Sequence, residues 1–305
     1  MTDTPALPSA RRQLLERMLT EMRPRLHRYA ARMTGSVVDG DDVVQETVVK
    51  ALDSPPDIDD FSVLERWLVR VTHNTAIDFL RRRAREDARH ADEEPDMIID
   101  HSQRMDAFDA ALVGFRVFVQ LPPLQRSTVI FKDVLGYSLD EVATFTGSSV
   151  PAVKSALQRG RARLKELTHR PDETPEPVLD AHEHRLLLAY ASRFNARDFD
   201  AVRDMLADEV KLNLVNRIQA NGKAQVSNYF GHYSRHGGLQ LGVGLVDGKP
   251  ALLVFDAEDM DGAPLYFMVI EWSGHQVASI RDFRYTRYAL DGAQVVVVER
   301  PGPVL

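Results

Sequence analysis

The sequence predicts a multidomain protein in which two all-α domains precede an α+β domain. Apolar residues recur at helical spacing through most of the first 167 positions. Two polar segments rich in acidic residues and proline, 86–103 and 170–177, interrupt this pattern and are typical of linkers. From residue 210 onward, apolar stretches separated by glycine-containing turns indicate strands. The order of these patterns along the chain predicts the fold class.

Composition narrows the class of protein further. The chain has 305 residues, of which 44% are hydrophobic and 27% charged, as in ordinary globular proteins. It has no cysteine, which excludes disulfides and thiolate metal sites. The opening residues MTDTPALPSARRQ lack the apolar core of a signal peptide, and no apolar run approaches membrane-spanning length. We therefore expect a cytoplasmic protein with no membrane association.

Charge is distributed unevenly along the chain, although the net value is only −7. Residues 1–170 hold 25 basic and 26 acidic side chains, whereas residues 171–305 hold 13 and 19. Five arginines fall within 81–89, and residues 154–165 carry five cations and no acid. Basic segments beside acidic ones suit a protein that meets phosphate on one face and a protein partner on another.

The helical part contains a series of predicted elements with clear boundaries. Two helices are expected within 10–53, separated by Thr34-Gly35-Ser36, and a third from about Ser62 to about Arg85. Further helical patterns cover 105–120 and 121–136. At 137–167, a short helix, a glycine turn and a second helix rich in cations form a helix-turn-helix. Ser138 and Glu141 are spaced as a capping box at its start.

The C-terminal part has a different pattern. Residues 179–209 are predicted to be helical, and a second helix is expected at 226–233. Strands are expected in KLNLV, GLQLGVGLV, ALLVFDA, PLYFMVIEW and QVASIRDFRYTRYAL, with turns at VDGKP, EDMDGA and SGHQ. This arrangement predicts helices packed on a curved antiparallel sheet.

Three motifs in the helical part resemble an extracytoplasmic-function (ECF) sigma factor of the sigma-70 superfamily. GDDVVQETVVKAL and RWLVRVTHNTAIDFLRRR resemble two parts of sigma region 2. LPPLQRSTVIFKDVLGYSLDEVATFTGSSVPAVKSALQRGRARLKEL resembles region 4. In the C-terminal part, FNARDFDAVRDMLADEV and NGKAQVSNYF resemble a SnoaL-like domain with the cystatin-like cone fold.

The resemblance implies a division of the chain and a function. The expected parts are a region 2 helical bundle at 10–86, an acidic linker at 87–104, a region 4 helix-turn-helix domain at 105–168, a proline-rich linker at 169–178 and a SnoaL-like regulatory domain at 179–305. The implied function is to bind core RNA polymerase, to recognise the −35 and −10 elements of promoter DNA and to promote transcription initiation. The sequence identifies neither the promoters nor an anti-sigma factor.

The helix around RWLVRVTHNTAIDFLRRR would face the −10 element as it opens. Arginines there can neutralise phosphates, Asn74 can pair with a base edge, and Trp67 can stack on an exposed base. The competing interpretations are that Trp67 is a core aromatic, which its apolar neighbours favour, and that Asp78 is an intrahelical partner of Arg81 or Arg82. The predicted −10 residues are Arg66, Trp67, Arg70, His73, Asn74, Arg81 and Arg82.

The second helix of the helix-turn-helix would enter the −35 major groove. The predicted contacts are Ala152, Lys154, Ser155, Ala156, Gln158, Arg159, Arg161 and Arg163. Arg161 and Arg163 are better suited to contacts with phosphates. Ala152 and Ala156 depart from the Thr and Arg of the common sigma pattern. Alanine can only touch a thymine methyl, so we expect an altered or relaxed −35 preference.

Four polar residues near the start of the second helix are predicted to contact the polymerase: Asp41, Asp42, Gln45 and Glu46. The acids among them also suit the positive end of the helix dipole, and both interpretations are compatible.

The C-terminal domain is predicted to modulate activity in cis rather than to catalyse a reaction. Acid–base chemistry would need a carboxylate with a raised pKa and an oxyanion partner. The residues of suitable type are Asp256, His182, His184, Tyr229, Tyr233 and Tyr266, and they form no diagnostic motif. We therefore predict no catalytic residue, metal site or cofactor. A short tether gives the domain a high effective concentration for docking on the sigma domains or on polymerase. The alternative is a helix-turn-helix regulator whose C-terminal domain senses a small molecule or is a vestigial enzyme.

Overall fold

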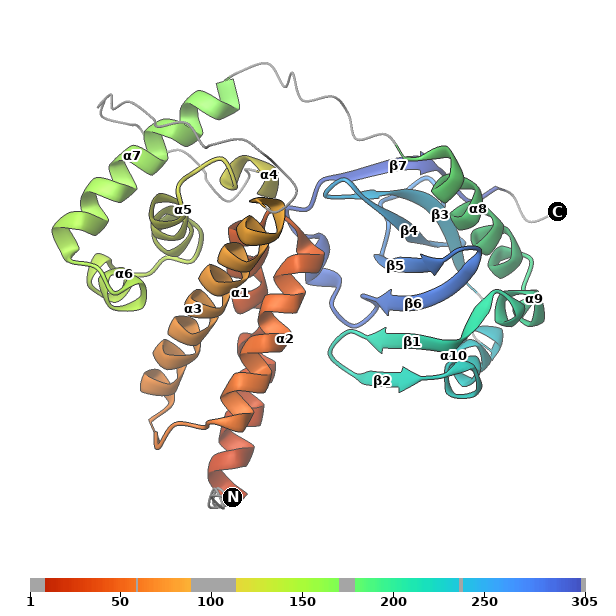
Figure 1. Ribbon diagram of the computed structural model, residues 1–305, viewed down its shortest axis with the longest axis horizontal. Helices are drawn as coiled ribbons and strands as arrows, with labels where there is room; N and C mark the ends of the chain where they lie inside the picture. The colour runs from red at the N-terminus through yellow and green to blue at the C-terminus, as the bar shows by residue number, and fades with distance from the viewer. Residues whose placement is uncertain (1–8, 59, 89–113, 170–178, 236–237, 303–305) are drawn as a thin grey trace. The chain divides into compact units, whose positions relative to one another are not determined.

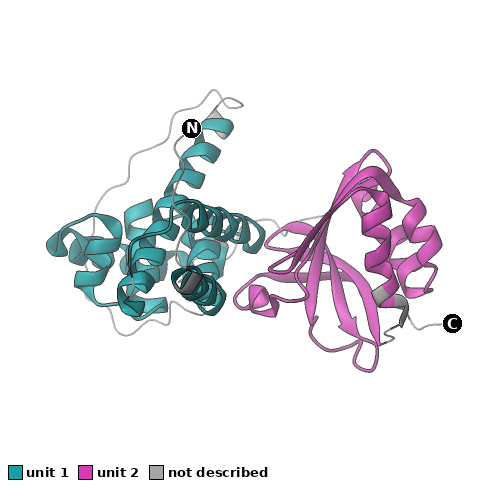
Figure 2. Ribbon diagram, turned by 90° about the horizontal axis from the view of Figure 1, so that it is seen from below, with its two compact units in different colours: residues 1–173 teal, residues 174–305 magenta. Residues whose placement is uncertain are grey.

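The computed structural model describes residues 9–58, 60–88, 114–169, 179–235 and 238–302. The chain forms two compact units, residues 1–173 and 174–305 (Figure 2). Residues 89–104 and 170–178 of the predicted linkers lie outside the described residues, as does the start of the helix predicted at 105–120.

Three long helices form the first half of unit 1: α1 (Ser9–Thr34), α2 (Val37–Asp53) and α3 (Phe61–Ala88). The predicted break between the first two is confirmed, because Gly35 takes a left-handed conformation with φ of 83°. Ser36 then caps α2 by accepting a hydrogen bond from the Asp39 backbone N–H. The long α1 packs against both α2 and α3, so the three helices enclose one apolar core.

The second half of unit 1 contains shorter elements: α4 (Phe115–Phe118), α5 (Pro123–Val129), the π-helical η2 (Ile130–Val134), α6 (Leu139–Thr146) and α7 (Val150–His169). The predicted helix-turn-helix is confirmed in α6 and α7. Ser138 and Glu141 form both hydrogen bonds of the capping box, and Gly147 ends α6 in the left-handed conformation.

The two halves of unit 1 share a single core. Phe131 of η2 stacks on Tyr29 of α1 with ring centroids 4.3 Å apart. Arg126 of α5 is buried and donates to the carbonyl of Met33 at the end of α1. Burial lowers the pKa of Arg126 to about 10. The predicted division into two domains is thus accompanied by close packing between them.

Unit 2 is an α+β unit, as predicted. Its helices are α8 (Ala181–Asn195), α9 (Phe199–Asp204), α10 (Lys223–Arg235) and the 3-10 helix η3 (Arg287–Leu290). Its strands are β1 (Leu206–Leu214), β2 (Ile218–Asn221), β3 (Leu239–Val246), β4 (Lys249–Asp256), β5 (Tyr266–Ser273), β6 (Gln276–Asp282) and β7 (Val295–Glu299).

The strands form one curved sheet in the order β2-β1-β6-β5-β4-β3-β7 (Figure 1). β1 and β6 run parallel, and all other pairs are antiparallel. Asp247 and Gly248 both have positive φ, which confirms a tight hairpin turn in VDGKP. Helices α8, α9 and α10 share one apolar core with the sheet. This is the helix-on-curved-sheet architecture expected for the C-terminal domain.

Among the helices of the described residues, none is long and apolar enough to cross a membrane.

Candidate nucleic-acid and polymerase interface

Helix α7 presents a polar outer face. The residues on its exposed side include Ala152, Lys154, Ser155, Gln158 and Arg159. The opposite side packs on α5 and α6. Gly160 allows the close approach to α5, since a Cβ there would lie 2.8 Å from a methyl of Val129. The exposed row has the length and polarity of a helix that enters a groove.

Ala156 requires a correction. Its exposed fraction is 0%, because it lies on the same side as Val153 and Leu157. In this unit, Ala156 is a core residue, and only Ala152 of the two alanines is exposed. The error arose because alanine is compatible with either side of an amphipathic helix.

The two arginines further along α7 already have acidic partners. Arg161 donates to both carboxylate oxygens of Asp133 in η2, with its Nε 2.8 Å from Oδ2. Arg163 lies 3.1 Å from Glu166, one helical turn ahead. The bidentate Asp133 pair ties α7 to η2, so it has a structural role whether or not Arg161 also meets a phosphate.

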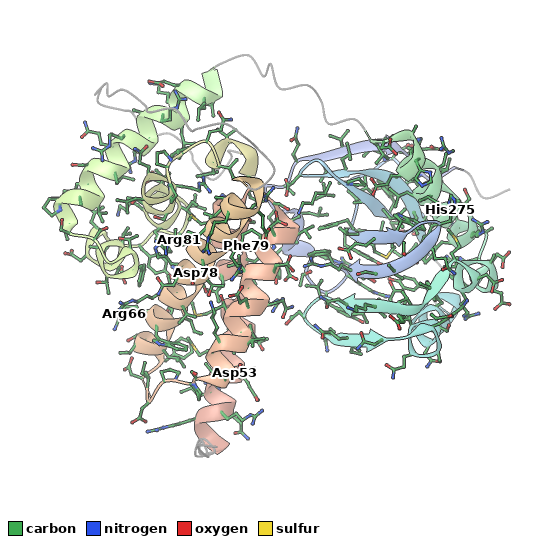
Figure 3. All side chains as sticks on the ribbon, viewed as in Figure 1. Asp53, Arg66, Asp78, Phe79, Arg81 and His275 are labelled. Atoms are coloured by element: carbon green, nitrogen blue, oxygen red, sulfur yellow. The ribbon has the colours of Figure 1, made fainter. Side chains whose placement is uncertain are left out.

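Helix α3 carries the polar row noted in the sequence. Arg66, Arg70 and Asn74 recur every four residues and are exposed. Trp67 is half-buried and packs on the core, as the competing interpretation held. Arg66 and Arg81 lie far apart along α3, and Asp78 lies close to Arg81 (Figure 3).

His73 does not belong to this row, which corrects the prediction for it. Its exposed fraction is 7%, and its Nδ1 lies 2.6 Å from the hydroxyl of Tyr29. Burial lowers the pKa of His73 to about 4, so the imidazole is neutral at pH 7. A neutral, enclosed imidazole has no role at a phosphate backbone.

The arginines at the end of α3 are balanced by acids. Arg81 lies 3.8 Å from Asp78 in an exposed intrahelical pair, as the sequence suggested. Arg82 reaches α2 and lies 2.7 Å from Glu46. This hydrogen bond lowers the pKa of Glu46. The contact fixes α3 against the helix that carries the predicted polymerase contacts.

On α2, the predicted polymerase residues divide by exposure. Asp42 is exposed, and Gln45 and Glu46 are half-buried. Asp41 has an exposed fraction of 1% and forms a buried pair with Arg23 at 2.7 Å. Asp41 is therefore a structural residue in this unit, which corrects its predicted role.

Sequence reasoning missed two apolar residues on the outer side of α2. Val49 is 55% exposed and Leu52 40% exposed, and they follow Gln45 at spacings of four and three. Apolar residues on both sides of α2 are the signal that would have revealed them, because the inner side is already filled by the core. The outer side of α2 therefore combines polar and apolar groups, as protein interfaces do.

Unit 2 contains a buried polar cluster that the sequence revealed only in part. Tyr229 and Tyr233 of α10 donate to Oδ2 of Asp282 at 2.5 and 2.9 Å. The hydroxyls of Tyr233 and Tyr266 lie 3.2 Å apart, and Oδ1 of Asp282 accepts the backbone N–H of Arg284. Burial raises the pKa of Asp282.

Asp282 was not predicted, although an acid two residues after Ile280 occupies the inward phase of a strand. The hydrogen bonds of this cluster involve none of Asp256, His182 and His184. His184 instead lies 3.2 Å from Glu299, and His182 lies against His275 with ring centroids 5.4 Å apart.

A helix-turn-helix with an exposed polar row, beside a helical bundle that bears cations, is an arrangement common among DNA-binding transcription proteins. Comparison with known families gives the finer assignment. The family described as "Sigma-70 region 2" matches residues 18–86, and "Sigma-70, region 4" matches residues 116–164.

Curated relatives agree with these matches. The ECF RNA polymerase sigma factor SigE of Mycolicibacterium smegmatis is 29% identical over 174 residues, covering 54% of this chain and 63% of the relative. The ECF RNA polymerase sigma factor SigM of Mycobacterium tuberculosis is 31% identical over 143 residues, covering 47% of this chain and 70% of the relative. The chain belongs to the ECF sigma factors of the sigma-70 family.

Among solved structures, the M. tuberculosis ECF sigma factor SigJ is similar with a TM-score of 0.35 and 21% identity, covering 88% of this chain and 96% of SigJ. The epoxide hydrolase/cyclase-like enzyme SalBIII is similar to part of the chain, with a TM-score of 0.27 and 18% identity over 33% of this chain and 88% of SalBIII.

Proposed function

We propose that this chain binds core RNA polymerase, reads the −10 and −35 promoter elements and promotes transcription initiation. One observation carries the proposal: within the residues matched to regions 2 and 4, α3 and α7 each present an exposed row of polar side chains, and the outer side of α2 combines polar and apolar groups. A cytoplasmic location follows from these partners.

The polymerase contact is assigned to the outer side of α2. Asp42, Gln45 and Glu46 supply polar groups, and Val49 and Leu52 supply apolar area. Charged groups that are partly buried around a small apolar centre are typical of transient interfaces, in which the two proteins associate and dissociate.

The DNA contacts are assigned to exposed residues only. On α3, Arg66 and Arg70 neutralise phosphates, and Asn74 pairs with a base edge in the −10 element. On α7, Gln158 offers a bidentate amide, and Ala152 offers a methyl contact to thymine in the −35 element. Lys154, Ser155 and Arg159 contact the DNA backbone and hold α7 in place on it.

The two DNA elements cannot both be engaged by the packed unit. Their centres are about 25 base pairs apart, or ~85 Å of duplex at 3.4 Å per step. A compact unit of 173 residues has a radius of gyration of about 16 Å. We therefore propose that the predicted domains 10–86 and 105–168 separate when the chain joins polymerase.

The C-terminal unit is proposed to modulate initiation in cis, without a catalytic role of its own. The proposal is supported by its tether to the helical unit, which keeps its local concentration high.

The test is transcription in vitro with bacterial core RNA polymerase on a library of candidate promoters, with the full chain and with a truncation after Glu173. Initiation by either protein is expected. If neither initiates at any promoter, the sigma function fails and an activator that binds DNA without polymerase becomes the better interpretation. The ratio of the two activities measures what unit 2 contributes.

A further inference from the structure

One end of the sheet in unit 2 carries a cluster of arginines. β1 and β6 run parallel and therefore end on the same side, where β1 turns into β2 (Figure 1). The backbone N–H of Val215 donates to the Asp282 carbonyl at 3.0 Å, so the turn and the segment after β6 are in contact. Arg217 lies in the turn, and Arg284 and Arg287 lie in the segment.

The positive charge at this end faces solvent. Arg217 and Arg287 are exposed, Arg284 is half-buried, and Tyr285 between them is 43% exposed. Within 210–219 and 281–290, the only acid is Asp282. Its exposed fraction is 0%, and its carboxylate accepts hydrogen bonds from the tyrosines of α10. It attracts the half-buried Arg284, whereas Arg217 and Arg287 are exposed at the surface.

Aromatic rings hold two of the guanidinium groups in place. Arg217 lies over the ring of Tyr285 at 4.8 Å, and Arg284 lies over Tyr233 at 5.3 Å. A stacked guanidinium keeps its N–H donors free at the edge of the plane while its position is fixed. The guanidinium groups of Arg217 and Arg284 are therefore positioned before any ligand arrives.

Three other arginines of unit 2 have hydrogen-bond or ion-pair partners. Arg203 pairs with Asp200 at 2.6 Å, Arg300 donates to the carbonyls of Met260 and Gly262, and Arg197 donates to the carbonyls of Tyr233 and Leu239. These contacts lie within α9, between the segment just before α9 and the elements α10 and β3, and at the loop of Met260 and Gly262. The arginine cluster, which we define as Arg217, Arg284 and Arg287 with Tyr285, is a local positive surface on a unit whose overall charge is negative.

We propose that the arginine cluster binds the phosphate backbone of duplex DNA outside the two promoter elements, without reading sequence. The inference rests on the proposed function, which brings the chain to DNA. Arginine and tyrosine donors are the groups that contact phosphates. The exposed large apolar side chains there are Ile218 and Tyr285, and Arg217 covers one face of the Tyr285 ring, whereas a protein partner would need a larger apolar centre. Two exposed charges engaged in this way release counterions and make binding dependent on salt.

The experiment is fluorescence anisotropy of the full chain with a 40-base-pair duplex that contains no promoter element, over a range of salt concentrations. The test variant is Arg217→Glu with Arg287→Glu. The matched control is Arg185→Glu with Arg193→Glu, two exposed arginines of α8 whose replacement changes net charge equally. We expect the test variant to bind at least about tenfold more weakly at low salt, with a salt slope smaller by about two, and the control to stay near wild type.

Equal affinity and equal salt slope for the two variants would overturn the proposal. Loss of core polymerase binding in the test variant, with duplex binding equal to the control, would also overturn it and identify a protein partner instead. Transcription from a template that ends just upstream of the −35 element separates this outcome from the proposed function. A wild-type chain that initiates neither on this template nor on its counterpart with upstream DNA rejects the sigma function, while anisotropy still decides whether the cluster binds DNA.

Discussion

Single residues at the border between core and surface decide which side chains are available on α3 and α7, the two helices proposed to face the promoter. His73 and Ala156 both fall within predicted DNA-binding rows, yet both are buried. Arg70 and Ala152, each within four positions of one of them, are exposed. Because both residues are buried, they are expected to affect the stability of unit 1 rather than DNA binding. The pH matters at His73, and side-chain size matters at Ala156.

The first prediction concerns the pH dependence of His73. The folded unit keeps this imidazole neutral down to about pH 4, whereas the unfolded chain protonates it near pH 6.5. Its contribution to stability is therefore complete above pH 6.5 and decreases as the pH falls toward 4, by at most about 3 kcal/mol. Urea unfolding at pH 7 and pH 5 is expected to show a smaller difference for His73→Gln than for wild type. Equal differences would mean that the imidazole titrates normally in the folded state.

The second prediction contrasts two alanines of α7. Ala156→Arg places a long cation in a filled core, so unit 1 should lose about 3 kcal/mol or more of stability. Ala152→Arg adds the same side chain at an exposed position and should leave stability nearly unchanged while altering −35 binding. Thermal unfolding and duplex binding of both variants check this. A stable Ala156→Arg variant would show that α7 rotates this position outward.

At the scale of elements, helix ends and turns are easier to predict from the sequence than a π-helix or an edge strand. The capping box at Ser138 and the turn at Asp247-Gly248 were predictable because their chemistry is local. The π-helical η2 and the edge strands β2 and β7 were not predicted. The run VVVV in β7 was a usable strand signal, whereas nothing local distinguishes η2 from an α-helix.

The third prediction concerns the contact between α1 and α2 at Gly40. A Cβ at Gly40 would lie 2.6 Å from the backbone nitrogen of Ala31, so the helices would have to move apart. Gly40→Ala should therefore destabilise unit 1 by about 2 kcal/mol, although alanine favours helices. Gly231 of α10 has open space around it, and Gly231→Ala should stabilise unit 2 by up to about 1 kcal/mol. Calorimetry that resolves the two units checks both signs. If Gly40→Ala leaves the stability of unit 1 unchanged, α1 and α2 can move apart without loss of stability.

At the scale of the whole molecule, the packing between the two halves of unit 1 determines whether α3 and α7 can act together in the proposed promoter contacts. Arg25 of α1 connects three groups: its guanidinium lies 2.7 Å from Glu65, 3.1 Å from the Leu135 carbonyl and 4.3 Å from the Tyr137 ring. Two of these contacts lead to the region 4 half. They stabilise the packed arrangement of the two halves, and the proposed function requires this arrangement to open.

The fourth prediction follows from this arrangement. Arg25→Ala should weaken the packed state by about 1 kcal/mol, because the pair is partly exposed. If opening limits initiation, transcription in vitro should rise by up to about fivefold. Arg12→Ala, which removes only an exposed pair with Glu16 on the same helix, is the matched control. Unchanged transcription in Arg25→Ala, with polymerase affinity intact, would argue that the halves separate freely.

Local sequence patterns were enough to predict the order of the units, the helices of regions 2 and 4, the helix-turn-helix and most of the exposed residues on α3 and α7. These features depend on periodicity and on capping or turn chemistry, which act over a few neighbouring residues. Only the tertiary structure decided that Ala156, His73 and Asp41 are buried, that Asp282 gathers the tyrosines of unit 2, and that Arg217 meets Tyr285. Each of these outcomes depends on residues distant in the chain, and no local pattern specifies which of them will be neighbours.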